Sequence, residues 1–254
     1  MLELWQWPLL FATGLVAGFV DSIAGGGGLI TLPVLLNCGL DPRLALGTNK
    51  LQATFGSGSA TWHFARGGLV NWTECRRGAV LTFAGGVVGT LTVQQLDPAF
   101  LRRFIPTLLL GVAVYLFFKP ALGSTDASPR LPRGTFDALF GLGLGFYDGF
   151  FGPGTGTFWA MAFVLGLGFN LTKATAQTKA MNFASNAASL LFFLWAGQVH
   201  FGAGLVMGAG QLLGARWGAG MVLKRGTRLV RPVFLAIVVA LTLKLLYDAF
   251  VKRG

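Results

Sequence analysis

The sequence predicts an all-α polytopic membrane protein made of two inverted repeats of about five segments each. Of its 254 residues, 54% are hydrophobic and 11% charged, with a mean hydropathy of +0.65, whereas soluble domains carry about 25% charged residues. Long apolar runs recur along the whole chain, and the second half repeats motifs of the first. The net charge of +11 fits loops rich in Lys and Arg on the cytoplasmic side of a membrane. Nucleic acid is therefore not an expected partner.

The apolar runs fall into two groups of five, separated by a polar linker, within one integral membrane domain. The first repeat (1–122) has segments 9–24, 28–38, 44–65, 78–95 and 103–119. The linker is 123–133, and the second repeat (134–254) has segments 135–151, 156–168, 173–196, 203–222 and 232–250. Because a full span needs about 20 residues, 9–24 with 28–38 forms either one broken span or a hairpin of two short ones.

Matched residues in the same order indicate a duplication rather than chance similarity between glycine-rich segments. The correspondence joins Asp21, Lys50 and Pro106 to Asp148, Lys179 and Pro232, respectively. Small-residue pairs also correspond, and they predict close helix–helix contact: Gly14/Gly18, Gly141/Gly145, Gly85/Gly89 and Gly210/Gly214.

The positive charges favour an inverted relation between the halves. Four segments per half would divide the loop Lys and Arg residues equally between the two sides, whereas five per half gather most of them on one side. The second arrangement obeys the positive-inside rule. An odd number of segments per half inverts the repeats and places both termini outside, on the side of the membrane opposite the cytoplasm.

Each half has one glycine-rich break inside an apolar run, at 21–28 and at 148–156. Glycine lets the backbone reverse, and the helix that restarts directs free N–H groups and its positive dipole end towards the break. Inverted repeats bring two such breaks together near the midplane, which predicts an anion site. Its predicted backbone donors are Gly25, Gly26, Gly27, Gly28, Gly154, Thr155 and Gly156. A tight turn between packed helices, without a ligand, is the alternative.

Lys50 and Lys179 are predicted to supply positive charge to this site. Lys50 lies roughly 10 Å into its helix at about 1.5 Å per residue, and two-fold symmetry would bring Lys179 to the same cavity. Polar neighbours predicted to add hydrogen bonds are Asn49, Gln52, Thr178 and Asn182, and the polar stripe continues through Ser185, Asn186 and Ser189. Two alternatives stay open: snorkelling of each lysine to an interface, or neutralisation by Asp21 and Asp148 in a structural ion-pair core. The aspartates would otherwise shape the breaks or carry a coupling proton.

No cofactor, metal site or enzymatic activity is expected. The two cysteines and two histidines have no metal-ligand spacing, and Cys38 and Cys75 lie at opposite ends of segment 44–65, too far apart for a disulfide. Paired catalytic carboxylates and a Ser/His arrangement are also absent from the sequence pattern.

The motifs around both breaks resemble the TauE/SafE family of sulfite-exporter-like membrane proteins. In the first half these are 18–33 (GFVDSIAGGGGLITLP) and 45–52 (ALGTNKLQ); in the second, 145–156 (GFYDGFFGPGTG) and 174–179 (ATAQTK). The resemblance covers nearly the whole chain. It implies a carrier in the bacterial inner membrane for small sulfur-containing or organic anions such as sulfite and sulfonates.

The resulting expectation is a secondary transporter that exports such an anion across the cytoplasmic membrane by alternating access. Its partners are the small anionic substrate and the lipid bilayer, while coupling to a proton or cation and the oligomeric state stay open. A passive anion channel built from the same parts is the alternative function.

Overall fold

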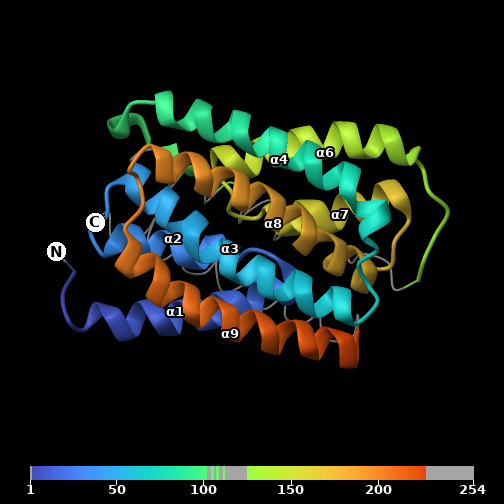
Figure 1. Ribbon diagram of the computed structural model, residues 1–254, viewed down its shortest axis with the longest axis horizontal. Coiled ribbons are helices and arrows are strands. Elements are labelled where there is room, and N and C mark those ends of the chain that lie inside the picture. The colour runs from blue at the N-terminus through green and yellow to red at the C-terminus, as the bar shows by residue number, and fades with distance from the viewer. Residues whose placement is uncertain (1, 102–103, 106, 109–110, 112–124, 227–254) are drawn as a thin grey trace.

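The computed structural model describes residues 2–101, 104–105, 107–108, 111 and 125–226, and this part of the chain is helical without any strand. Figure 1 shows the helices lying side by side as one elongated bundle. The first half contains α1 (Gln6–Ala24), α2 (Gly27–Asn37), α3 (Pro42–Arg66) and α4 (Trp72–Gln95). The second half contains α6 (Arg133–Phe150), α7 (Thr155–Leu167), α8 (Leu171–Trp195) and α9 (Phe201–Arg225).

These helices match the predicted segments closely. Most ends agree to within three residues, and the largest difference is at the start of α4, which begins at Trp72 rather than at 78. The predicted segment 232–250 and most of 103–119 lie outside the described residues. The linker runs beside the end of α7, where the Ala127 N–H donates to the Gly168 carbonyl at 2.7 Å.

Side-chain caps explain why several helices begin where they do. Asp41 accepts a hydrogen bond from the Arg43 N–H at 3.0 Å and precedes Pro42 at the first position of α3. Asn170 accepts from the Lys173 N–H at 2.9 Å at the start of α8. Such residues satisfy N–H groups that have no partner inside the helix.

The predicted small-residue contacts are confirmed. Helix α1 packs on α9, and α6 packs on α4. A Cβ atom on Gly14 would lie 2.0 Å from the Met207 carbonyl oxygen, and one on Gly214 would lie 2.0 Å from that of Leu15. In the other pair of helices, a Cβ on Gly89 would lie 2.0 Å from the Phe146 oxygen. Only glycine permits these backbones to approach so closely.

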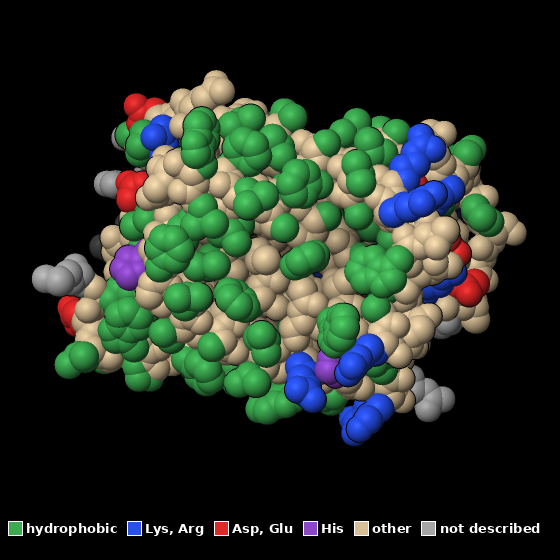
Figure 2. Space-filling model, in the orientation of Figure 1, with side chains coloured by type: hydrophobic (Ala, Val, Ile, Leu, Met, Phe, Trp, Pro, Cys, Tyr) green, Lys and Arg blue, Asp and Glu red, His purple; other side chains and the backbone are tan. Residues whose placement is uncertain are grey.

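Large apolar side chains cover the outside of the bundle, and polar ones lie inside. Exposed examples come from five helices: Val16, Val80, Leu139, Leu191 and Leu205. Buried polar residues concentrate on α3 and α8: Thr48, Asn49, Lys50, Gln52, Gln177, Thr178, Lys179, Asn182, Ser185, Asn186 and Ser189. Figure 2 shows hydrophobic side chains spread over one face, with most of the Lys and Arg in view near its right-hand end.

Among the described helices, α1 alone is both long and apolar enough, by length and composition, to cross a membrane. Helices α2 and α7 are apolar but shorter. The inward polar residues of α3 and α8 lower the average apolarity of these two helices, although their outer surfaces carry residues such as Phe55 and Leu191. Cys38 and Cys75 are free thiols, as expected from the sequence.

Two substitutions in α9 test the close packing. Gly214→Ala should lower the free energy of unfolding by about 1–3 kcal/mol, because the new methyl group overlaps the α1 backbone. Gly220→Ala is the matched control, since nothing lies within 4 Å of its Cβ position, and it should raise stability by up to about 1 kcal/mol. The melting temperatures of the detergent-solubilised proteins measure both, and equal melting temperatures would contradict the packing.

Candidate functional site

Both breaks depend on glycines whose backbone other residues rarely adopt. Gly25 and Gly26 have φ of +80° and +91° between α1 and α2, and Gly154 has φ of +86° at the start of α7. Left-handed values of this kind favour glycine because it has no Cβ. A Cβ on Gly27 would lie 2.8 Å from the Cβ of Asp21. Helix α2 therefore begins beside the last turns of α1.

The two breaks, far apart in the sequence, are in direct contact. A Cβ on Gly25 would lie 2.6 Å from the Thr157 nitrogen, and one on Gly28 would lie 3.2 Å from the Pro153 Cα. The Thr157 hydroxyl donates to the Ala24 carbonyl at 3.2 Å. The N-terminal ends of α2 and α7 are thus held close together.

Two buried ion pairs join the halves reciprocally. Lys50 on α3 lies 2.8 Å from Asp148 Oδ1 on α6, and Lys179 on α8 lies 2.9 Å from Asp21 Oδ2 on α1. The side chains of Lys50 and Lys179 are 1% and 0% exposed, so neither snorkels to an interface. The sequence left open whether the lysines supply free positive charge, snorkel to an interface or are neutralised by the aspartates. In the structure, each lysine is neutralised by the aspartate of the other half.

Each carboxylate also receives a second donor. Asp21 Oδ1 accepts from the Gly27 N–H at 3.0 Å, which caps the start of α2. Asp148 Oδ2 accepts from the Ser185 hydroxyl, and Lys50 additionally donates to the Asp148 carbonyl. The aspartates therefore shape the breaks and hold the lysines.

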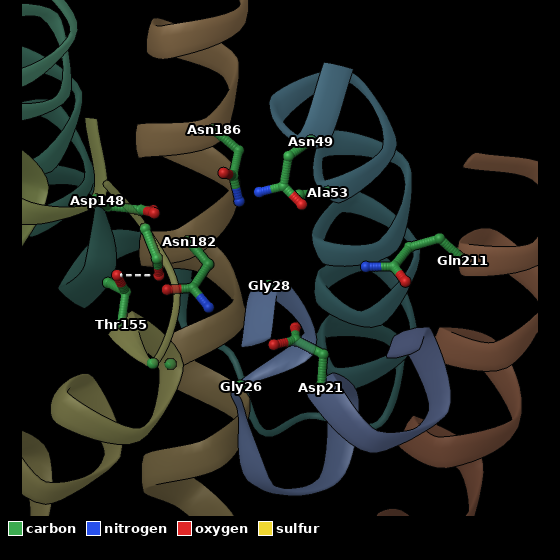
Figure 3. A pocket seen from close by; sticks show the side chains of 13 residues that line it. Asp21, Gly26, Gly28, Asn49, Ala53, Asp148, Thr155, Asn182, Asn186 and Gln211 are labelled. Carbon is green, nitrogen blue, oxygen red and sulfur yellow. Dashed lines mark hydrogen bonds between the residues drawn. The ribbon is translucent and has the colours of Figure 1, made fainter. Parts of the chain in front are cut away.

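A small cavity lies between the breaks and the central helices (Figure 3). Its volume is about 30 Å³, which holds about two water molecules at roughly 10–15 Å³ each. Its lining comprises Asp21, Gly26, Gly28, Asn49, Ala53, Asp148, Gly152, Gly154, Thr155, Gly156, Asn182, Asn186 and Gln211. The charged lining residues are thus the two aspartates, with which Lys50 and Lys179 are paired.

Two amide side chains are fixed so that they donate into the cavity. Asn49 Oδ1 accepts from the Thr31 hydroxyl at 2.6 Å and from Gln52 Nε2 at 2.8 Å. Asn186 Oδ1 accepts from Lys50 Nζ at 3.3 Å. Because each oxygen is occupied by donors, the NH₂ group of each amide must point the other way. Figure 3 shows both nitrogens directed into the space between α3 and α8.

The structure brings most of the predicted site residues to this cavity, some in supporting positions. Gln52 orients Asn49, and Gly25 and Gly27 pack behind the lining. Thr178 does not line the cavity, and its hydroxyl donates to the Ala174 carbonyl of its own helix at 2.8 Å.

Four lining residues were not assigned to the site from the sequence: Ala53, Gly152, Asn186 and Gln211. Asn186 lies on the predicted polar stripe, one helical turn after Asn182, so helical spacing could have identified it. Gln211 comes from α9, and no motif connects that helix with the breaks.

An apolar exterior, a small polar cavity and two broken helices meeting beside it are typical of membrane transporters. The family model described as "Sulfite exporter TauE/SafE" matches residues 10–245. The chain belongs to this family.

Relatives of nearly full length agree with this assignment. A "Probable membrane transporter protein" of Haemophilus influenzae is 47% identical over 240 residues, which is 94% of each chain. "Probable membrane transporter protein YfcA" of Escherichia coli is 44% identical over 241 residues, covering 95% of this chain and 90% of the relative. A Sinorhizobium protein, "Probable membrane transporter protein ORF9", is 44% identical and covers 94% and 92%. No solved structure matches.

A double-mutant cycle tests the ion pair of Lys50 and Asp148. Asp148→Leu and Lys50→Met should each destabilise the fold by about 3–5 kcal/mol, because each leaves a buried charge without its partner. The double variant should lose much less than the sum of the two, since no unpaired charge is left. Thermal unfolding in detergent gives the three values, and strictly additive losses would contradict a direct pair.

Proposed function

We propose that this protein is a secondary transporter of a small sulfur-containing or organic anion, such as sulfite or a sulfonate, across the bacterial cytoplasmic membrane. Export is the direction in the printed description of the family. The small size of the cavity supports a substrate with few atoms.

The observation that carries the proposal is the convergence of fixed donors on one cavity. Asn49 and Asn186 contribute amide groups whose oxygens are already occupied. Gly28 and Gly156 also line the cavity, near the starts of α2 and α7, and their N–H groups donate to no carbonyl in the described part of the chain. Donors at helix starts, combined with the positive dipole ends, favour an oxyanion.

The halves are proposed to act as inverted repeats that rock against each other in alternating access. Corresponding helices make corresponding contacts, α1 with α9 and α6 with α4. Both ion pairs cross between the halves, so any rocking motion must loosen them. A loosened lysine offers its charge to the anion, while its aspartate can bind a proton or cation, which would couple the two movements.

The proposed orientation places both termini in the periplasm and the basic end of the bundle in the cytoplasm. The gathering of Lys and Arg near one end of the face in Figure 2 supports it. Exposed apolar side chains along the helices provide the surface for the lipid.

Transport assays distinguish a carrier from a channel. In proteoliposomes loaded with unlabelled sulfite, a carrier should take up labelled sulfite by saturable counterflow. Currents that grow with concentration without saturation, in the absence of counterflow, would show a passive anion channel instead.

Asn49→Leu should reduce sulfite counterflow about tenfold or more, because a hydrogen bond to a charged group contributes about 1.5–3 kcal/mol. Gln94→Met is the control: Gln94 donates to the Phe192 carbonyl at 3.1 Å and does not line the cavity. Both variants should elute as folded protein in size-exclusion chromatography. If Asn49→Leu and Gln94→Met lost counterflow to the same extent, Asn49 would have no specific role in binding the anion.

A further inference from the structure

The cavity contains unsatisfied acceptors as well as donors. Asn182 and Gln211 line it and are 5% and 2% exposed, and their side-chain oxygens accept no hydrogen bond from the described residues. Neither amide nitrogen donates to a described residue, so both polar ends of each amide are free for a ligand. A buried carbonyl without a donor costs about 1–3 kcal/mol. A ligand that supplies a donor would recover this energy.

The charges around the cavity disfavour a dianion. Asp21 and Asp148 line it, and their positive partners Lys179 and Lys50 are each held in an ion pair with them. These four charges sum to zero, so a doubly charged anion would face two carboxylates without additional positive charge. The neighbouring Tyr147 hydroxyl is occupied, since it donates to the Pro153 carbonyl at 2.8 Å. The described lining contains no further titratable side chain.

The carboxylate of Asp21 has room for a donor. Its side chain is 19% exposed, against 5% for Asp148, and Figure 3 shows its oxygens directed into the space below Asn49. A ligand can therefore place oxygens on the fixed NH₂ groups of Asn49 and Asn186. On its other side, the Asp21 carboxylate, which faces this space, can accept from an O–H group.

We infer that the bound species is a small oxyanion with a single negative charge and a hydrogen-bond donor of its own, of the hydrogen sulfite type, rather than the dianion. This inference rests on the proposed function, because it assumes that the cavity binds the transported anion. One consequence is that the substrate carries its proton through the membrane, so that proton movement needs no change in the protonation of the protein.

A matched pair of anions tests the inference on the full-length protein in detergent by titration calorimetry. Chlorate has the pyramidal three-oxygen shape and the single charge of hydrogen sulfite but no proton. At a pH below the second ionisation of sulfurous acid, hydrogen sulfite should bind about tenfold more tightly or better, because chlorate leaves the buried acceptors unsatisfied. Above that ionisation sulfite binding should weaken in step with the loss of hydrogen sulfite. Chlorate binding should stay constant, and it reports any titration of the protein itself.

Single substitutions test whether the side-chain oxygens of Gln211 and Asn182 accept the hydrogen bond from the anion. Gln211→Met and Asn182→Leu remove an amide oxygen each and should lower the preference for hydrogen sulfite over chlorate, whereas Gln94→Met should preserve it. Because the preference is a ratio measured on one sample, partial loss of folded protein does not affect it. Equal affinities for the two anions, or tighter binding of the sulfite dianion, would overturn the inference and leave the anion site intact. Absence of binding by both anions would overturn the proposed function as well.

Discussion

The reciprocal ion pairs are the interaction on which the rest of the structure depends. Lys50 with Asp148 and Lys179 with Asp21 place four charges where water is largely excluded. An isolated buried charge is costly, whereas a close pair with additional hydrogen bonds is tolerated. Since each pair takes one member from each half, the charges can be satisfied only when the two halves pack together.

The glycines of the two breaks serve this arrangement in two ways. Some supply left-handed backbone, as at Gly26 and Gly154. Gly152, with φ of +98°, also leaves space for the charged groups, since a Cβ there would lie 2.8 Å from Asp148 Oδ1 and 2.9 Å from Lys50 Nζ. A side chain at Gly152 would push the lysine away from its carboxylate. The backbone conformation of the break and the packing of the ion pair therefore both require glycine.

The same arrangement accounts for the neutral character of the cavity in this conformation. With both lysines paired, the donors that remain for the proposed anion carry no net charge: the amides of Asn49 and Asn186 and the N–H groups at the starts of α2 and α7. Fixed amide dipoles select for shape and hydrogen-bond polarity, whereas a free lysine would attract any anion. A site of this kind can release its ligand more readily than a site with unpaired charge, which suits transport.

The sequence by itself determined the helices, the close glycine contacts, the two breaks and the family. These features depend on local properties, such as apolar run length and glycine spacing, that can be read along the chain. It also identified the four charged residues, but not how they pair. The choice between a positive site and an ion-pair core depends on distances between residues that are 98 and 158 positions apart in the sequence.

Only the tertiary structure decided that Lys50 and Lys179 are paired with the carboxylates and that Gln211 reaches the cavity from α9. It also fixed the orientation of the Asn49 amide, because Thr31 on α2 and Gln52 on α3 both donate to its oxygen. Hydrogen-bond polarity inside a cavity is set by partners from different elements, so it follows from the packing and cannot be read from residue spacing. Sequence periodicity shows which face of a helix is polar, whereas packing shows which atoms of that face stay free for a ligand.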